Sequence, residues 1–192
     1  NMKLVFTILS IVTLFIARAQ QPAGLQVGAA APDFTLNDQD GKSFQLKQTN
    51  KEKTVVLIFY RGQWCPYCSK QIKGLQDSMQ LIADKGATVV AITPEIPANV
   101  QKTIEKTKAA FPILTDEGLR VMNQYKVAFA VDEKTIERYK RFNIDFNEAN
   151  GANGTNLPVP AVYIIRNGKI VWRYFDADYR KRPSVNEIAA QL

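Results

Sequence analysis

The sequence predicts an α/β fold in which helices cover both faces of a central mixed β-sheet, with a β-hairpin added at the N-terminal side. Two observations predict this class. Apolar, β-branched runs alternate with segments whose apolar residues recur at helical spacing. Near the end of the chain, Asn167-Gly168 separates two such runs, which is a strong hairpin signal. A third observation concerns chemistry, because the only two cysteines, Cys65 and Cys68, lie between a predicted strand and a predicted helix.

The N-terminal residues have the pattern of a secretory signal peptide. A basic residue precedes the apolar stretch 4–17, and the small-residue site Ala17-Arg18-Ala19 predicts cleavage after residue 19. We therefore divide the chain into a signal peptide over residues 1–19 and one domain over residues 20–192. The apolar stretch is shorter than the roughly 18 residues of a membrane-spanning helix. We expect an exported protein, periplasmic or otherwise extracytoplasmic, with no stable membrane insertion after cleavage; an uncleaved anchor is the alternative.

The first half of the domain is predicted to form a hairpin and then a strand, a helix and a strand. Residues 33–36 and 43–46 flank the turn-forming segment 37–41, which predicts the N-terminal hairpin. Residues 54–60 (TVVLIFY) are β-branched and aromatic, as in a buried strand. Residues 69–85 carry apolar side chains at helical spacing. The next predicted elements are a strand over 87–93, a helix over 98–109 and a short strand over 112–114.

The second half is predicted to contain more helix, a loop and a second hairpin. Residues 147–156 (NEANGANGTN) are rich in Gly and Asn, so we expect a loop there. Residues 161–165 and 169–174 form the hairpin around Asn167-Gly168, and Ser184 caps a final helix through residue 192. Before the loop, the predicted elements are a helix over 116–125, a strand over 127–131 and a helix over 133–142.

The two cysteines have the spacing of a redox dithiol. Cys65 and Cys68 stand at the start of a predicted helix, where unpaired N–H groups and the helix dipole stabilise a thiolate. Such positions lower the pKa of a thiol from about 8.5 into the range ~3.5 to 7.5. We expect Cys65 to attack a substrate disulfide and Cys68 to resolve the mixed disulfide. A structural disulfide is the first alternative, but it would close too short a loop to restrict the unfolded chain much.

Composition excludes several other classes of function. The chain has no histidine, so Ser-His-Asp hydrolysis and Cys-His proteolysis lack their base. With two cysteines and no histidine, a zinc site would need carboxylates or a second subunit, and we expect neither a metal nor another cofactor besides the redox-active cysteine pair. The net charge of +7 is spread over predicted helices and turns without interleaved aromatic residues, so no nucleic-acid partner is expected.

Several motifs follow one another in the domain in a fixed order. They are Gly28-x-x-Ala31-Pro32-Asp33-Phe34-x-Leu36, the turn Asp40-Gly41-Lys42, residues 55–68 (VVLIFYRGQWCPYC) and residues 89–95 (VVAITPE). Together they resemble the alkyl hydroperoxide reductase/thiol-specific antioxidant branch of the thioredoxin superfamily. The resemblance covers about residues 27–192 and implies a domain with a thioredoxin-like fold. Exported thiol-disulfide oxidoreductases and peroxiredoxin-like proteins with a C-x-x-C are the most similar groups.

The resemblance also implies roles for residues near the dithiol. Thioredoxin-fold enzymes have a cis proline opposite the dithiol, and Pro160 occupies that place, although a rigid trans turn is the alternative. The preceding residue, Val159, would then lend its backbone to an extended substrate. Trp64 and Tyr67 would form an apolar rim for substrate, or else only cover the core. The resemblance implies protein thiol or disulfide substrates and a thiol electron donor as partners.

Two charged residues have open roles in this interpretation. Arg61 either adds positive potential near the thiolate or lies in solvent, and the sequence favours neither. Glu95 follows a predicted strand and is a candidate proton shuttle for the dithiol, but an exposed carboxylate in a turn is the favoured interpretation.

The alternative function is a thiol peroxidase acting on hydrogen peroxide or alkyl hydroperoxides. Peroxiredoxins carry Pro-x-x-x-Thr-x-x-Cys, and this pattern falls on Arg61, Cys65 and Cys68, so the proline and threonine are both replaced. Arg182 is a candidate for the arginine that holds the peroxide in the family, but a solvated basic turn is favoured. Disulfide exchange is therefore preferred over peroxidase activity, and a non-enzymatic binding module is the second alternative.

Overall fold

The computed structural model describes residues 22–192. The predicted signal peptide over residues 1–19 lies outside these residues and stays a prediction. Within residues 22–192, every helix is too short or too polar to cross a membrane.

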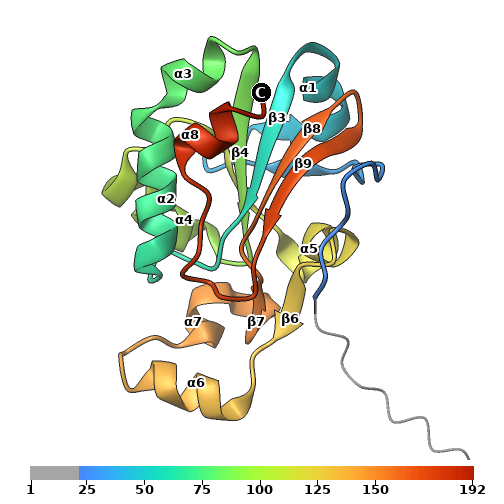
Figure 1. The fold of residues 1–192 in the computed structure, drawn as a ribbon. Coiled ribbons are helices and arrows are strands. Elements are labelled where there is room, and N and C mark those ends of the chain that lie inside the picture. The colour runs from blue at the N-terminus through green and yellow to red at the C-terminus, as the bar shows by residue number, and fades with distance from the viewer. Residues whose placement is uncertain (1–21) are drawn as a thin grey trace, which may run out of the picture.

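A five-stranded mixed sheet forms the centre of the fold, in the order β5-β4-β3-β8-β9 (Figure 1). β3 is the middle strand because its residues from Val55 to Phe59 are buried and apolar, as a strand covered on both faces requires. It pairs in parallel with β4 and antiparallel with β8. The strands are β3 (Thr54–Phe59), β4 (Ala87–Thr93), β5 (Ile113–Thr115), β8 (Ala161–Arg166) and β9 (Lys169–Phe175).

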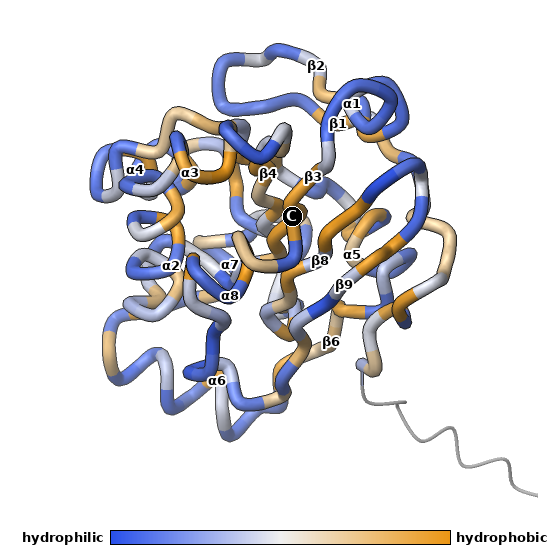
Figure 2. Tube along the Cα trace, turned by 45° about the horizontal axis from the view of Figure 1, so that its top comes forward, coloured by the Kyte–Doolittle hydropathy of each residue, from blue (hydrophilic) through white to orange (hydrophobic). Residues whose placement is uncertain are grey.

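Helices cover both faces of this sheet, as predicted. Alternate residues of β3 point to opposite sides, so that Val56 packs into one core cluster and Val55 into the other. Figure 2 shows the apolar strands in the interior and hydrophilic segments around them. One face is covered by α2 (Pro66–Asp77), α3 (Met79–Ala83), α4 (Pro97–Thr107) and α8 (Val185–Ala189), and the other by α1 (Leu46–Glu52) and α5 (Arg120–Gln124).

Two predicted elements of the first half differ in the structure. The N-terminal hairpin is present as β1 (Thr35–Asn37) and β2 (Ser43–Gln45), but α1 follows it directly and was not predicted. The helix expected over residues 69–85 is two helices, because Ser78 has non-helical dihedral angles between α2 and α3.

The helix expected over residues 116–125 starts later than predicted. Glu117–Leu119 forms a short 3-10 turn, η1, in which Gly118 has a φ of 74°. The carboxylate of Asp116 accepts hydrogen bonds from the backbone N–H groups of Val121 and Met122, which fixes the first turn of α5.

A compact insertion lies at the carboxyl end of the parallel strands, in the lower part of Figure 1. The predicted loop over residues 147–156 is wrong, because most of that segment is regular structure. In chain order the insertion contains β6 (Ala128–Ala130), α6 (Glu133–Lys140), α7 (Phe146–Asn150), a 3-10 turn η2 (Gly151–Asn153) and β7 (Asn156–Pro158), and β6 pairs antiparallel with β7.

Buried asparagines explain why this Gly- and Asn-rich segment is ordered. Asn153 donates from Nδ2 to the carbonyl oxygens of Pro94 and Asp116, at 2.7 and 3.0 Å, and its Oδ1 accepts from the N–H of Gly118 at 2.9 Å. These bonds join the insertion to the loops that follow β4 and β5. The segment lacks an apolar pattern and is ordered instead by polar side chains that form hydrogen bonds with buried backbone groups.

We predict that Asn153→Ala destabilises the protein by about 2 to 4 kcal/mol, because two buried carbonyls and one N–H lose their partner. Urea unfolding, followed by circular dichroism, measures the change. Asn147→Ala is the matched control, since Asn147 is exposed in the same segment and its loss should change stability by less than about 0.5 kcal/mol. Equal midpoints for the two variants would contradict this account of the insertion.

Candidate active site

The dithiol lies at the N-terminus of α2, as the sequence predicts. Cys65 is the N-cap residue, Pro66 is the first helical residue, and the carbonyl oxygen of Cys65 accepts from the N–H groups of Cys68 and Ser69, each at 3.1 Å. Both thiols are free, and both are buried, with exposed fractions of 1% for Cys65 and 0% for Cys68. Burial of both sulfurs was not expected from the sequence and determines their acidity.

The two thiols have opposite pKa shifts. The hydrogen bond to Cys68, together with burial, raises the pKa of Cys65 above its usual value. Burial also works against ionisation of Cys68, but the hydrogen bond from Cys65 and the charge of Arg182 outweigh it and lower the pKa of Cys68 to about 6. The pair therefore shares one proton near neutral pH, with the negative charge mainly on Cys68.

Arg182 contacts this thiolate, so the prediction that it lies in a solvated basic turn is wrong. Its Nη2 lies 3.5 Å from the Sγ of Cys68, and its Nε donates to Gln71 at 3.0 Å. Arg182 also donates from Nη1 to the carbonyl oxygens of Tyr179 and Lys181. These bonds hold the guanidinium in one orientation against the sulfur.

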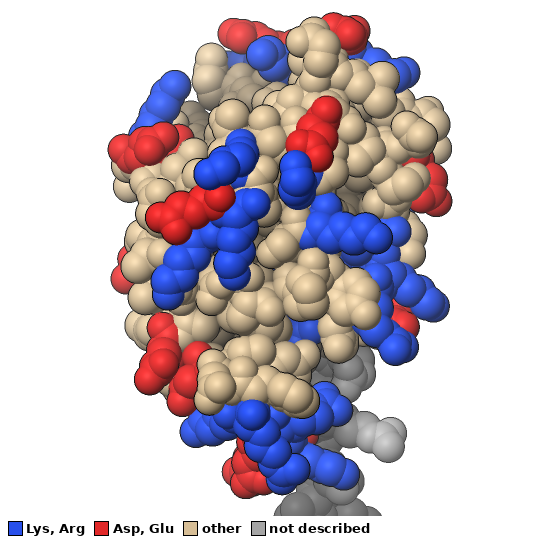
Figure 3. All heavy atoms as spheres, turned by 90° about the vertical axis from the view of Figure 1, so that its left-hand side faces the viewer, with Lys and Arg blue, Asp and Glu red and all other residues tan. Residues whose placement is uncertain are grey.

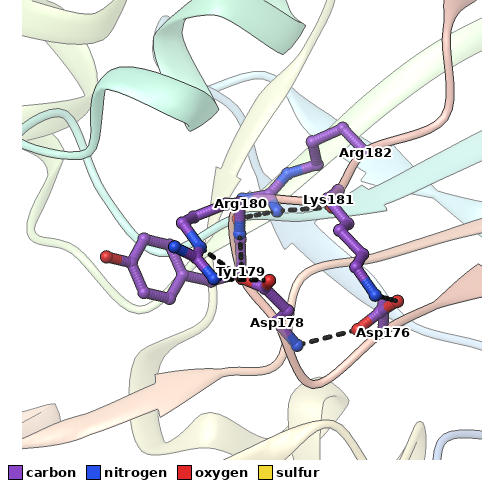
Figure 4. A network of polar contacts seen from close by, with 6 residues as sticks. All are labelled: Asp176, Asp178, Tyr179, Arg180, Lys181 and Arg182. Carbon is purple, nitrogen blue, oxygen red and sulfur yellow. Dashed lines mark hydrogen bonds and ion pairs between the residues drawn. The ribbon is translucent and has the colours of Figure 1, made fainter.

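The loop over residues 176–182 is ordered by its own ion pairs, drawn in Figure 4. Arg180 pairs with Asp178 at 2.8 Å, and Lys181 pairs with Asp176 at 3.2 Å. Directly after the loop, Ser184 and Glu187 form a capping box that starts α8, as the sequence predicts for Ser184. The sequence predicts the cap, because its signal is local. It does not predict the contact of Arg182 with Cys68, because that contact depends on the path of the loop.

Glu95 is completely buried, so the favoured prediction of an exposed turn carboxylate is wrong. Its Oε2 accepts a hydrogen bond from the N–H of Gln63 at 2.8 Å, while its Oε1 has no partner within the described residues. Burial raises the pKa of Glu95 to about 8, against the hydrogen bond from Gln63, and the nearby Cys68 adds to this rise. A carboxyl group that is mostly protonated at neutral pH therefore lies beside the dithiol.

Gly62 permits the close packing around this carboxyl group. A Cβ atom at residue 62 would lie 2.8 Å from the Oε1 of Glu95 and 2.5 Å from the Nε1 of Trp64. Both distances are shorter than any normal contact, so a side chain there would displace Glu95 or Trp64. The sequence alone does not indicate this role of Gly62, because it depends on the packing of Glu95, which is distant in the chain.

Arg61 lies next to the dithiol and not in solvent, which answers the question left open by the sequence. Its guanidinium carbon Cζ lies 4.1 Å from the ring centre of Tyr179, 4.9 Å from Trp64 and 5.4 Å from Tyr139. Nη2 donates to the hydroxyl of Tyr139 at 2.8 Å. The residue is 5% exposed, and its Nε and Nη1 have no hydrogen-bond partner within residues 22–192.

Two adjacent hollows meet at Arg61. The first, which we call the Cys65 cleft, is lined by Cys65, Trp64, Tyr67, Tyr179 and Arg61, and Cys68 does not reach it. The second, the Pro160 cavity, is lined by Arg61 and Tyr179 together with Phe129, Leu157, Val159 and Pro160.

The two predicted rim residues differ in their surroundings. Trp64 packs edge-on against Tyr139 and at a tilt against Phe146, with ring centres 5.4 and 5.3 Å away, so it also covers the core of the insertion. Tyr67 is 39% exposed and packs edge-on against Tyr179. Both side chains line the Cys65 cleft, as a substrate rim would.

The expected cis proline is absent: Pro160 follows a trans peptide bond, as do all residues described here. The neighbouring strand pair explains the difference. β7 ends at Pro158, and the N–H of Val159 donates to the carbonyl oxygen of Val127 at 2.8 Å, which extends the pairing with the β6 side of the insertion. This donor is therefore used within the protein. Contact of Val159 and Pro160 with substrate stays a prediction, and both residues do line a cavity beside the dithiol.

Comparison with known proteins places these features in a family context. Residues 27–173 match the AhpC/TSA family. Peroxiredoxin Q, chloroplastic, of Populus jackii is 36% identical over 105 residues, which are 55% of this chain and 49% of that protein. Thiol-disulfide oxidoreductase ResA of Bacillus cereus is 29% identical over 122 residues, 59% of this chain and 69% of that protein. The chain thus spans about half the length of the peroxiredoxin Q relatives that it matches.

Solved structures confirm the predicted thioredoxin-like fold. Peroxidoxin BcpB from Mycobacterium tuberculosis has a TM-score of 0.67 at 21% identity, covering 87% of this chain and 96% of that chain. A proposed thiol:disulfide interchange protein DsbE from Chlorobium tepidum has a TM-score of 0.57 at 21% identity, covering 79% of this chain and 86% of that chain. At these identities the likeness establishes the fold, and the chemistry rests on the site itself.

We predict that Arg182→Met raises the pH at which the dithiol first ionises by about one pH unit or more, because an opposite charge within ~4–6 Å typically lowers the pKa of an acid by 1–3. The ultraviolet absorbance of the thiolate, followed against pH in the reduced protein, measures this midpoint. Arg180→Met is the matched control, since Arg180 is exposed and pairs with Asp178. A midpoint unchanged by Arg182→Met would disprove the role of Arg182.

A second prediction concerns Glu95 and stability. Between pH about 4.5 and about 6 the unfolded chain loses the Glu95 proton while the native protein keeps it, so the free energy of unfolding falls as pH rises, by up to about 1.4 kcal/mol per pH unit. Above this range the ionising dithiol contributes in the opposite direction. Urea unfolding of the reduced protein should show a smaller slope in Glu95→Gln, whereas the exposed control Glu137→Gln keeps it. The same slope in Glu95→Gln and wild type would mean that native Glu95 is ionised.

Proposed function

This chain belongs to the AhpC/TSA family, and on that premise we propose that it is a thiol-disulfide oxidoreductase that exchanges electrons between the Cys65/Cys68 dithiol and protein disulfides. The observation that carries the proposal is the different position of the two buried cysteines. Cys65 lines the Cys65 cleft with its aromatic rim, whereas Cys68 does not line it. A cysteine in the cleft wall and a second one behind it, joined by a hydrogen bond, suit attack by Cys65 and resolution by Cys68.

In the first step the sulfur of Cys65 forms a bond with one sulfur of the substrate disulfide. The substrate S–S bond breaks, and the other substrate sulfur leaves as a thiolate that takes a proton. For this attack the shared proton must move from Cys65 to Cys68, which leaves the thiolate facing the cleft. Arg61 favours this state, because its positive charge lowers the pKa of Cys65.

In the second step Cys68 attacks the sulfur of Cys65 and releases the second substrate thiol. Two electrons have then passed from the dithiol to the substrate, and the protein holds the Cys65–Cys68 disulfide. Cys68 must lose its proton for this step, and the contact with Arg182 stabilises the thiolate that results. We assign the relay of this proton to Glu95, whose pKa is raised to about 8: the protonated carboxyl group gives its own proton to the leaving substrate sulfur and takes up the proton of Cys68.

A thiol electron donor would close the cycle by reducing the Cys65–Cys68 disulfide. Within this proposal the protein works outside the cytoplasm, in an exported form that lacks residues 1–19. That location is supported by the apolar stretch and cleavage pattern of the N-terminus.

One observation favours peroxidase activity as a second candidate. From the sequence, this activity was less favoured because Arg61 and Cys65 replace the proline and threonine of the peroxidase pattern and Arg182 was expected in a solvated turn. Arg182 instead lies 3.5 Å from Cys68. In this mechanism the thiolate of Cys68 attacks one peroxide oxygen, the O–O bond breaks, and water or an alcohol leaves. Cys65 then displaces water from the sulfenic acid to form the same disulfide. The complete burial of Cys68 limits this route to small peroxides.

We predict that the reduced protein, starting near residue 20, is oxidised by a protein disulfide such as insulin faster than by hydrogen peroxide. Stopped-flow fluorescence at equal oxidant concentrations compares the two rates. Cys68→Ser should accumulate mixed disulfides through Cys65, and Cys65→Ser should not. Peroxide oxidation at about 10⁵ M⁻¹s⁻¹ or faster that depends on Cys68 would instead favour the second candidate.

A further inference from the structure

The guanidinium of Arg61 has more hydrogen-bonding capacity than the fold uses. Arg61 is 5% exposed, and its Nε and Nη1 have no partner within residues 22–192. The three aromatic rings around it stabilise its charge through their faces but do not accept these in-plane N–H groups. A buried charged donor without a partner is costly, so its retention calls for an explanation beyond folding.

The position of Arg61 indicates what such a partner would be. Arg61 lies in the wall shared by the Cys65 cleft and the Pro160 cavity. The other walls of the Pro160 cavity are mainly apolar and include Phe129, Leu157 and Pro160. A ligand with an apolar stem could therefore occupy this cavity, offer an anionic group to Arg61 and keep its reactive bond at Cys65.

Resting on the proposed function, we propose that Arg61 binds a carboxylate that the substrate carries next to its disulfide. The free Nε and Nη1 of Arg61 suit a carboxylate, because a hydrogen bond between a guanidinium and a carboxylate is charge-assisted and about twice as strong as a neutral one. Tyr179 covers the guanidinium at 4.1 Å, is half-buried and lines both hollows, so its ring must turn aside when the acid enters.

The surface charge around the site agrees with an acidic substrate. Figure 3 shows Lys and Arg side chains gathered at the lower end of the molecule, where α6 lies. The basic residues of this helix and its end are Lys134, Arg138, Lys140 and Arg141. They raise the local concentration of anions near the site. The acidic groups that line the two hollows have partners: Asp132 accepts from the N–H of Thr135, and Asp178 pairs with Arg180.

Three small disulfides of similar size test the proposal: 3,3′-dithiodipropionate with carboxylates, bis(2-hydroxyethyl) disulfide without charge, and cystamine with ammonium groups. The wild type should reduce the carboxylated compound at least about ten times faster than the neutral one, and it should reduce cystamine most slowly. The reason is that only the carboxylated compound can accept a charge-assisted hydrogen bond from Arg61. Arg61→Gln should remove this preference. The control Arg180→Gln removes an exposed charge at the same cleft. At high salt, where exposed charges are screened, this variant should keep the preference for the carboxylated disulfide.

A pair of peptide disulfides that differ only in Asp or Asn beside the cysteine provides the second arm. A preference for the acid among the small disulfides indicates a low-molecular-weight substrate, and a preference for Asp indicates an acidic segment of a protein. Either preference supports the proposal. Equal rates within both sets in the wild type would overturn it while leaving the proposed function intact. Failure to reduce any disulfide, neutral or charged, would overturn the proposed function instead.

A binding measurement separates the carboxylate site from catalysis. Trp64 stacks on Arg61, so in a Trp172→Phe variant its fluorescence should respond to propionate with a saturable change. Propionamide should give no such change, and Arg61→Gln should abolish the response to propionate. An equal response to propionamide, or one that persists in Arg61→Gln, would disprove binding of the acid by Arg61.

Discussion

The burial of two sulfur atoms at the start of a helix is the constraint on which the whole site depends. With almost no water around Cys65 and Cys68, one thiol cannot ionise without help from the other and from nearby charges. The fold supplies that help through the helix N-terminus and Arg182. The same absence of water keeps Glu95 mostly protonated at neutral pH, so the ionisation of Cys65, Cys68 and Glu95 is controlled by one buried region.

The insertion between β6 and β7 adds a second layer to this arrangement. Its residues Tyr139 and Phe146 pack against Trp64, and Tyr139 accepts a hydrogen bond from Arg61. The core sheet positions the sulfurs, while the insertion decides what surrounds the cleft in front of them. The two sulfurs and the walls of the cleft in front of them are therefore positioned by different parts of the chain, in line with the general tendency of binding sites to lie in segments carried by a rigid scaffold.

Much of the scaffold was predictable because its signals are local. The buried strand before Cys65, the helix after it and the Ser184 cap all follow from residue types and short spacings. The features that were missed depend on contacts between distant segments. Asn153 looks like a loop residue until its carbonyl partners at Pro94 and Asp116 are known.

The residues of the site that the sequence did not predict correctly also depend on contacts between distant segments. Glu95 and Arg182 are charged residues in turns, and turn charges are usually solvated, so the sequence favoured exposure for both. Tertiary packing places them beside Cys68 instead. Pro160 shows the reverse case, because the family pattern implied a cis bond there and the structure has a trans bond.

The match to the AhpC/TSA family ends at residue 173, whereas Arg182 lies beyond it. The tail that carries Arg182 is fastened on its own, by ion pairs within residues 176–182 and by the capping box of α8. The acidity of the Cys68 thiol thus depends on a segment that lies far from both cysteines in the sequence. Two proteins could share the entire matched region, differ only in this tail, and have dithiols of different redox strength. Grafting such tails between relatives is a route to adjusting the driving force of the dithiol without altering the scaffold that holds it.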